Sequence, residues 1–308
     1  MKIALAGIGK IALDQHVPSL AQSPDWKLEA TISRQGHVAG TEAFSSVEDM
    51  LAARPDIGTV SLCLPPVPRF DVARAALCAR RHVMLEKPPG ASLAEVHFLH
   101  DLAQEMGVTL FVTWHSRMAR GVADARRWLA GRNIREGRII WREDVCRWHP
   151  GQDWIFKPGG MGVFDPGINA LSILTEILPS PIRLVSAELD FPANRQTPIA
   201  ARLNMSGNIS ADFDFRQQGP QGWDMEFVTD QGTLALRMGG NIVEIDGRPA
   251  GGVNDTAGEY PALYAHMAGL VRDGKSDVDL SPMVLVADAF TLGYRNIVEP
   301  FEFRKETA

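Results

Sequence analysis

The sequence lacks long hydrophobic runs, basic blocks and paired cysteines. Its longest apolar segments have the length of strands, so no membrane span is expected. The formal net charge is -6 and both signs are mixed along the chain, which argues against a nucleic-acid or membrane partner. The three cysteines, Cys63, Cys78 and Cys146, show no pairing pattern. Cys63 and Cys78 lie in apolar segments and are expected to be buried thiols, which indicates a reducing, cytoplasmic location.

The N-terminus also lacks the pattern of a signal peptide. MKIALAGIGK contains a short apolar run followed by glycines, which predicts a first strand. Apolar residues make up 45% of the chain and charged residues 22%, as in globular proteins with substantial cores. The length of 308 residues favours two domains.

The first 117 residues alternate short apolar runs with helical patterns. The expected strands lie at 2–7, 27–33, 59–66, 82–87 and 108–114, and helices are expected at 69–81 and 92–107. Ser92 and Glu95 form a capping box that opens the second helix, and Gly107 closes it. Continuous apolar strands alternating with helices predict a doubly wound α/β (Rossmann) domain at residues 1–117.

Residues 118–308 have a different pattern, in which alternating strands dominate. Strands are expected at 136–145, 183–191, 210–215, 224–230, 232–238 and 241–247, with helices near 121–130, 167–178, 261–272 and 283–295. Antiparallel strands with a few helices on one face predict an α+β second domain.

A glycine motif directly follows the first expected strand. Gly7-x-Gly9-x-x-Ala12 has the spacing in which the first glycine permits a tight turn and the second permits close approach of a pyrophosphate. The following helix start offers N–H groups to phosphate. An ordinary glycine-rich turn is the alternative. Pro18 should kink or restart this helix.

The end of the second expected strand, TISRQGH, lacks the carboxylate that binds the ribose 2′-OH of NAD. It carries Ser33 and Arg34 instead, a hydroxyl and a guanidinium that suit a 2′-phosphate. NADP is therefore the expected cofactor, with NAD as the second choice. A solvated loop arginine is the alternative interpretation of Arg34.

Lys87 and the pair Asp165 and Asn169 are candidate catalytic residues because of their positions in the expected strands and helices. Lys87 ends the strand in HVMLEKPPG, at the edge where open α/β sheets bind ligands. A lysine that extends to solvent from a strand end is the alternative. Asp165 and Asn169, in GGMGVFDPGIN, are four residues apart and share one face of a helix, although Asp165 could instead cap that helix.

EKPPG, GIGKIA and the Gly-Gly-x-x-x-x-Asp-x-Gly loop resemble the glucose–fructose oxidoreductase/inositol 2-dehydrogenase/rhizopine catabolism family. The resemblance covers essentially the whole chain. It implies a Rossmann domain, a second domain with a large, open, mostly antiparallel sheet, and catalytic roles for Lys87 and Asp165. Most relatives have histidine where this chain has Asn169. With Asn169, the chain is similar to a bacterial subgroup that oxidises L-arabinose and D-galactose with NADP. The segments that carry this similarity are DQHVPSL, TWHSR, RWHPGQ and EYPALYAH.

The resemblance also implies a mechanism and a set of site residues. Lys87, hydrogen-bonded to Asp165, would accept the proton of the anomeric hydroxyl while hydride leaves C1 for the nicotinamide, giving a lactone. Asn169 would bind sugar hydroxyls. The expected catalytic residues are Lys87, Asp165 and Asn169. The residues expected to bind the cofactor are Gly7, Gly9, Lys10, Ile11, Ser33, Arg34, Pro65, Glu86 and Lys87. The residues expected to bind the sugar are His115, Trp148, Asp165, Asn169 and Trp223.

Several of these assignments have open alternatives. Trp148 could be a core or interface residue, and His115 a structural histidine. His97 and His100 share a helix without a third ligand nearby, so no metal site is expected. Relatives commonly dimerise through the second-domain sheet, which makes a homodimer a family-level expectation. An enzyme acting on an inositol or imine, or a sugar sensor without turnover, remains an alternative function.

Overall fold

The computed structural model describes residues 1–252 and 258–304, which form two compact units. The first unit contains residues 1–118 and 258–280, and the second contains residues 119–252 and 281–304. In the described part of the chain, no helix is both long and apolar enough to cross a membrane.

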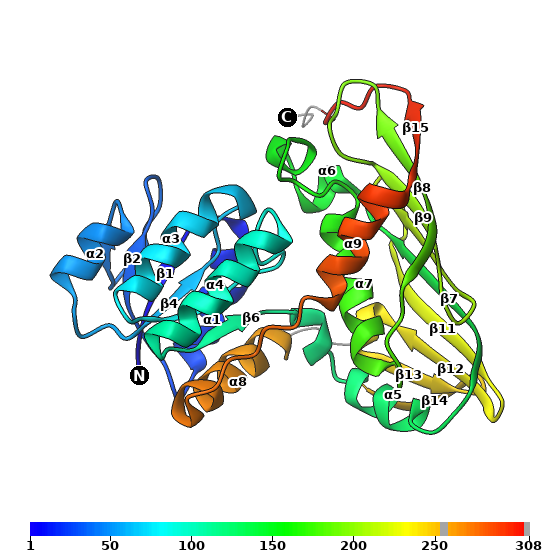
Figure 1. The fold of residues 1–308 in the computed structure, drawn as a ribbon, viewed down its shortest axis with the longest axis horizontal. Helices are drawn as coiled ribbons and strands as arrows, with labels where there is room; N and C mark the ends of the chain where they lie inside the picture. Colours follow the sequence, from blue (N-terminus) through cyan, green and yellow to red (C-terminus); the bar gives the residue numbers. More distant parts are fainter. Residues whose placement is uncertain (253–257, 305–308) are drawn as a thin grey trace. The chain divides into compact units, whose positions relative to one another are not determined.

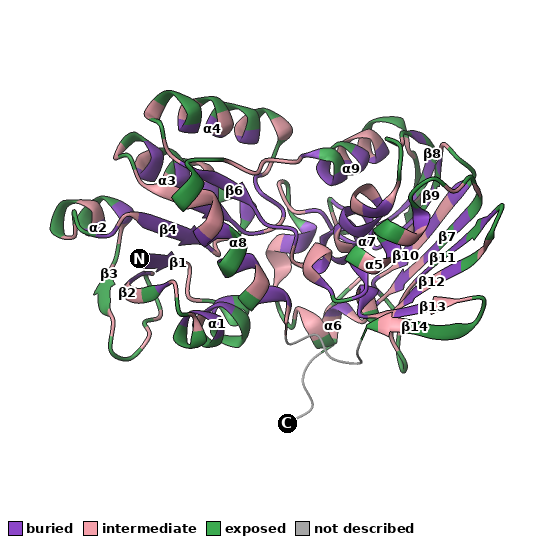
Figure 2. Ribbon diagram, turned by 90° about the horizontal axis from the view of Figure 1, so that it is seen from below, coloured by how far each residue is buried: buried purple, intermediate pink, exposed green. Residues whose placement is uncertain are grey.

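The first unit is built on a six-stranded parallel sheet, sheet A (Figure 1). Its strands are β1 (Lys2–Ala6), β2 (Lys27–Ile32), β3 (Glu42–Phe44), β4 (Thr59–Leu62), β5 (His82–Leu85) and β6 (Leu110–Val112). The order β3-β2-β1-β4-β5-β6 reverses direction between β1 and β4, which creates the crevice where such sheets bind dinucleotides. All four residues of β4 are buried, as expected for a strand covered on both faces (Figure 2).

Helices lie between these parallel strands in the chain, and one short helix follows the last strand. They are η1 (Ala12–His16), α1 (Val17–Gln22), α2 (Val47–Ala53), α3 (Pro66–Cys78), α4 (Leu93–Met106) and, after β6, η2 (His115–Met118). Ser92 accepts a hydrogen bond from the N–H of Glu95 at the start of α4, and Gly107 ends that helix with φ 67°, so the predicted N-cap and C-cap are confirmed. The Glu95 carboxylate accepts from the N–H of Ala91, one residue before the position that the capping box predicts. Pro18 lies in the first turn of α1, directly after the π-helical turn η1. The backbone stays helical at His16 and Val17, so the predicted kink or restart takes the form of a change from a π-helical to an α-helical turn.

One helix from late in the sequence completes this unit. Helix α8 (Glu259–Asp273) follows all but the last of the second-unit strands in the chain but packs against α1. Trp26 Nε1 donates to the carbonyl of Tyr264 over 2.8 Å. An apolar cluster joins α8 to sheet A and consists of Ile3, Leu20, Trp26, Met84, Phe111, Tyr260, Leu263, Tyr264, Met267 and Ala268. The sequence assigned residues 118–308 to one domain, whereas burial of this apolar helix face places 258–280 with residues 1–118.

The second unit contains a nine-stranded mixed sheet, sheet B, in the order β14-β13-β12-β11-β7-β10-β9-β8-β15. Its strands are β7 (Ile134–Arg142), β8 (Leu184–Pro192), β9 (Ala200–Met205), β10 (Ile209–Asp214), β11 (Gly222–Thr229), β12 (Gly232–Arg237), β13 (Ile242–Ile245), β14 (Arg248–Gly252) and β15 (Tyr294–Val298). Only the β10/β7 and β15/β8 pairs are parallel among these described strands. The predicted fold class, a Rossmann domain plus a large, mostly antiparallel sheet, is confirmed.

Helices cover one face of sheet B (Figure 1). The helices of this unit are α5 (Val122–Leu129), α6 (Val145–Trp148), η3 (Asp153–Phe156), α7 (Phe164–Ile177), η4 (Met238–Gly240) and α9 (Ser281–Leu292). Helix α7 packs against α5, α9 and β7. Strand β10 alternates buried and partly exposed residues, so the two faces of the sheet differ (Figure 2).

Two expectations from the sequence differ from the structure. The helix predicted for 283–295 ends at Leu292, and the chain continues as the edge strand β15 because residues 294–298 pair with β8. The prediction that Cys63 and Cys78 are buried is wrong. Cys78 is exposed at the last turn of α3 and Cys63 is partly exposed where the chain leaves β4.

The two motif glycines should respond differently to alanine. Gly7 has φ +88°, and an added Cβ would lie 2.8 Å from the N atom of Leu64, whereas a Cβ on Gly9 has no neighbour within 4 Å. Gly7→Ala is therefore expected to lower the free energy of unfolding by about 2 kcal/mol or more. Gly9→Ala, the matched control, should stay within about 1 kcal/mol of wild type. Urea unfolding followed by tryptophan fluorescence measures both, and equal stabilities would contradict the close approach to Leu64.

Candidate active site

The glycine loop and the ends of β2 and β4 lie together in the first unit. The N–H of Gly7 donates to the carbonyl of Ile32 over 2.9 Å, at the last residue of β2. The same glycine packs on the Cys63–Leu64 backbone beyond β4. The predicted cofactor residues Gly7, Ser33 and Pro65 thus lie at one edge of sheet A, the edge formed by the carboxyl ends of its strands.

The backbone of this loop is open at Gly9. A Cβ on Gly9 would have no neighbour within 4 Å, so other groups can approach the backbone there. The Ser33 hydroxyl accepts hydrogen bonds from the N–H groups of Gln35 and Gly36, which shapes the turn beyond β2. Arg34 is exposed in this turn, and Gly36 lies against Ile8 of the glycine loop. Lys10 forms an ion pair with Asp14.

Lys87 follows β5 at the same edge, as predicted. The N–H of Glu86 donates to the carbonyl of Leu62 over 3.1 Å, so the β4/β5 pairing reaches the residue before Lys87. The peptide bond from Lys87 to Pro88 is cis. The buried Arg69 guanidinium donates to the carbonyls of Leu64, Glu86 and Pro88, and it thereby links the chain beyond β4 to the chain around Lys87.

The Glu86 carboxylate lies inside a buried polar group that the sequence did not reveal. Its Oε1 accepts a hydrogen bond from the hydroxyl of Tyr260 over 2.9 Å and lies 3.3 Å from Nε2 of His16. Its Oε2 accepts from the N–H of Lys87 over 2.6 Å. Nδ1 of His16 lies 2.7 Å from the hydroxyl of Tyr264.

The titration of this group favours paired charges on His16 and Glu86. Burial would raise the pKa of Glu86, but hydrogen bonding and charge from His16, with the charges of His115 and Lys87, lower it to about 2. Burial would lower the pKa of His16, but interactions with Cys63, Tyr264 and Glu86 outweigh it and raise that pKa well above its usual value. Both pKa shifts favour the charged forms of these two buried side chains.

His115, a predicted sugar-binding residue, also lies in the first unit. Its Nδ1 is 2.6 Å from a carboxylate oxygen of Glu259, and its ring stacks on Tyr260 with centroids 5.4 Å apart. Glu259 and Tyr260 are the first two residues of α8. The segment EYPALYAH contributed to the family resemblance, but no role was predicted for Glu259 or Tyr260, because about 140 residues separate them from His115.

Asp165 and Asn169 lie in the second unit, on helix α7. Asp165 is buried in the first turn and does not cap the helix, since α7 already begins at Phe164 and the residue before it, Val163, is the N-cap. An Asp165 carboxylate oxygen lies 3.4 Å from Nε2 of His149, a residue that was not among the predicted site residues. The preceding glycines are tightly packed, because a Cβ on Gly160 would lie 2.3 Å from the carbonyl oxygen of Ile155.

Two tryptophans of the second unit bind one carboxylate. Glu143 Oε1 accepts hydrogen bonds from Nε1 of Trp223 over 2.9 Å and Nε1 of Trp141 over 3.2 Å. Trp148 packs edge-on against Trp223, with centroids 5.8 Å apart. Trp148 and Trp223, both partly exposed, are thus brought together as an aromatic pair. Glu143 was not predicted.

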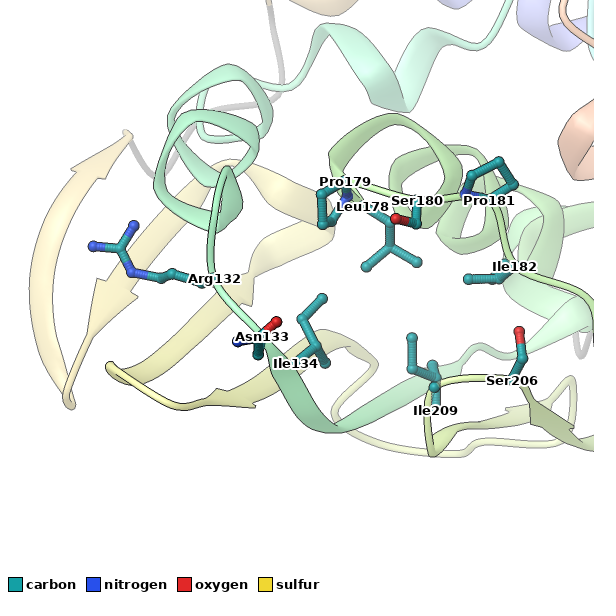
Figure 3. Close-up of a pocket in the computed structure, with 11 residues that line it drawn as sticks. Arg132, Asn133, Ile134, Leu178, Pro179, Ser180, Pro181, Ile182, Ser206 and Ile209 are labelled. Carbon is teal, nitrogen blue, oxygen red and sulfur yellow. The ribbon is translucent and has the colours of Figure 1, made fainter.

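A separate hollow of about 250 Å³ lies in the second unit (Figure 3). It is lined by Arg132, Asn133, Ile134, Leu178, Pro179, Ser180, Pro181, Ile182, Ser206, Gly207 and Ile209. None of the predicted site residues is among them. The side chains that line it carry no carboxylate, imidazole or thiol for acid–base chemistry. Within the described ranges, no three His, Cys, Asp or Glu side chains are grouped as metal ligands.

Comparison with known proteins places this arrangement among oxidoreductases. Residues 1–114 match the family model described as an oxidoreductase family with an NAD-binding Rossmann fold. Galactose 1-dehydrogenase from Pseudomonas fluorescens is 41% identical over 308 residues, which cover 98% of both chains.

Solved structures agree with this result. The crystal structure of D-galactose-1-dehydrogenase from Rhizobium etli has a TM-score of 0.93 and 48% identity, covering 98% of this chain and 97% of that chain. A 3-ketoreductase from Actinomadura kijaniata shares the fold, with a TM-score of 0.82 and 20% identity over 97% of this chain and 99% of its own. The chain therefore belongs to the glucose–fructose oxidoreductase/inositol 2-dehydrogenase/rhizopine catabolism family of oxidoreductases with an NAD-binding Rossmann fold.

Proposed function

We propose that this protein oxidises C1 of an aldose, D-galactose or L-arabinose, with NADP⁺ as the acceptor, and forms the aldonolactone. The observation that carries the proposal is the similarity to two galactose 1-dehydrogenases along 98% of the chain. Lys87 lies two residues beyond β5, and Asp165 and Asn169 lie on α7; together they supply a basic group, a carboxylate and an amide.

The first unit would hold NADP at the edge of sheet A that carries the glycine loop. The backbone around Gly7 and Gly9 would bind the pyrophosphate, because Gly9 leaves open space above the backbone. Ser33 and Arg34 would bind the 2′-phosphate, since the turn after β2 contains no carboxylate to repel it. Lys10, Ile11, Pro65 and Glu86 complete the proposed cofactor-binding set. When bound, the nicotinamide ring accepts a hydride.

The protein's own groups handle the proton and the sugar hydroxyls. Oxidation at C1 removes one hydride and one proton, and we assign the proton to Nζ of Lys87. Asp165, with His149 3.4 Å from its carboxylate, and Asn169 are assigned to binding and orientation of sugar hydroxyls. Trp148 and Trp223 would contact the apolar face of the sugar, and His115 would bind a hydroxyl. General-base assistance of this kind contributes ~10²–10⁴-fold to the rate.

Two sugars are proposed because their rings are alike. L-Arabinose and D-galactose share configuration at the first four carbons, and D-galactose adds one hydroxymethyl group. A pocket that accepts the larger sugar gains little discrimination against the smaller one, because one small group changes binding by only about 1–3 kcal/mol.

The activity is tested with the purified wild-type protein and a sugar panel. NADPH formation should be observed with D-galactose and L-arabinose and should be far slower with D-glucose, which differs at C4, and with myo-inositol. Trapping the product with hydroxylamine should detect the lactone. Turnover of myo-inositol or an imine instead would favour another substrate class. Sugar binding without NADPH formation would identify a sensor and contradict the proposal.

Lys87→Ala tests the proton acceptor. We expect kcat to fall by ~10²–10⁴-fold, because the anomeric proton loses its acceptor. The Kd for NADP, measured by fluorescence titration, should stay close to that of wild type. Lys27→Ala, which removes an exposed lysine of the same unit, serves as the control and should keep full activity. A Lys87→Ala variant with near-normal kcat would exclude Lys87 as the base.

Arg34→Ala tests the 2′-phosphate contact. We expect the KM for NADP to rise by about 10- to 100-fold, because a hydrogen bond to a charged group contributes roughly 1.5–3 kcal/mol. The KM for NAD should change little, since NAD lacks that phosphate. Arg74→Ala, at an exposed position of α3, is the matched control. Equal effects of Arg34→Ala on both cofactors would contradict the assignment.

A further inference from the structure

The peptide group that joins Glu86 to Lys87 is bound at both of its polar atoms. Its carbonyl oxygen accepts a hydrogen bond from Nη1 of Arg69. Its N–H donates to Oε2 of the Glu86 side chain over 2.6 Å. Arg69 also binds the carbonyl of Pro88, directly after Lys87. The backbone on each side of Lys87 is therefore held, and with it the direction in which the lysine side chain leaves the strand.

The Glu86 carboxylate has its own fixed position. Tyr260 donates to Oε1 over 2.9 Å, and Nε2 of His16 lies 3.3 Å from the same oxygen. Glu86 and Tyr260 are each 4% exposed and His16 is 0% exposed. Buried polar groups with several good partners have little freedom to move, because any rotation leaves a charge unpaired.

The charges in this group support one another. The lowered pKa of Glu86 and the raised pKa of His16 favour a carboxylate and an imidazolium in the folded protein. Burial and the nearby Glu86 charge raise the pKa of Tyr260 well above its usual value, so its hydroxyl stays protonated and donates. The hydrogen bonds to Oε1 therefore have a charged acceptor, and charge-assisted hydrogen bonds are stronger than neutral ones.

Helix α8 supplies the donor from a distant part of the sequence. Its first two residues contact two predicted site positions: Glu259 binds Nδ1 of His115, and Tyr260 binds Glu86. The ring of Tyr260 also stacks on His115. The helix also contacts the first unit through Trp26 and the apolar cluster, which includes Tyr260 of its first turn.

We propose that Glu86 and Tyr260 are positioning residues for the reaction, which hold the Lys87 peptide so that the side-chain amino group of Lys87 leaves the end of β5 in the productive direction. The inference rests on the proposed role of Lys87 as proton acceptor. Glu86 contacts the Lys87 backbone directly, and Tyr260, supported by His16, acts through Glu86. On this basis the first turn of α8 contributes to the position of Lys87 in the active site, in addition to packing on sheet A.

Tyr260→Phe tests the inference, because it removes one hydroxyl and keeps the ring that stacks on His115. We expect kcat to fall about tenfold with little change in KM for sugar or NADP, since small misplacement of a reacting group lowers the rate and not the binding. Thr113→Val is the matched control. It also removes one buried hydroxyl, which donates to the carbonyl of Leu85 in β5 over 3.0 Å, but it does not touch the Glu86 carboxylate.

A second measurement does not depend on turnover. In protein labelled with ¹⁵N-lysine, the Lys87 amide signal is identified by its loss in Lys87→Ala. Its short hydrogen bond to a carboxylate should place the amide proton far downfield. Tyr260→Phe should move this signal, Glu86→Gln should move it further, and Thr113→Val should leave it in place. Glu86→Gln keeps the shape of the side chain and removes its charge. It therefore provides a second test of the inference if Tyr260→Phe does not fold.

The outcomes separate the two ideas. A displaced amide signal together with a loss in kcat larger than that of Thr113→Val supports the inference. An unmoved signal, or a kcat loss no larger than that of the control, overturns it. If the wild-type protein oxidises no aldose, the proposed function fails, and the amide signal alone then decides whether Glu86 and Tyr260 position Lys87.

Discussion

Backbone polar groups at the carboxyl ends of buried parallel strands must find partners without help from bulk water, and this constraint organises the first unit. Beyond β4 and β5 the chain turns away from the ladder, so its carbonyl and N–H groups are no longer paired by neighbouring strands. Arg69 and Glu86 supply the missing partners from side chains. The groups that satisfy the strand ends also define the surroundings of Lys87.

The buried charges follow from the same constraint. A buried carboxylate without partners would carry a large desolvation cost, and His16 and Tyr260 offset that cost for Glu86. The π-helical turn η1, which ends at His16, places this histidine on the buried side of the first helix. Irregular helical turns of this kind are frequent at functional sites.

The second unit meets a different requirement. A sheet with one covered face needs helices that bury an apolar side, and α7 does so with nearly all of its residues buried. Asp165 is exceptional on this helix because it is a carboxylate in a buried first turn. Its neighbour His149 directly follows α6, and Trp148, the last residue of α6, packs on Trp223. Polar and aromatic groups are thereby gathered at one region of an otherwise apolar helix–sheet layer.

The amino-acid sequence alone determined the elements whose signal is local. The glycine spacing, the Ser92 cap, the position of Lys87 at a strand end and the pairing of Asp165 with Asn169 on one helix all depend on residues a few positions apart. Tertiary structure decided what depends on distant residues: the return of α8 to sheet A, the edge strand β15, the exposure of Cys78, and the partners of Glu86, His115 and Asp165. The physical reason is that hydrogen bonding and burial act through space, so residues such as Glu86 and Tyr260, separated by 174 positions, show no shared pattern until the chain has folded.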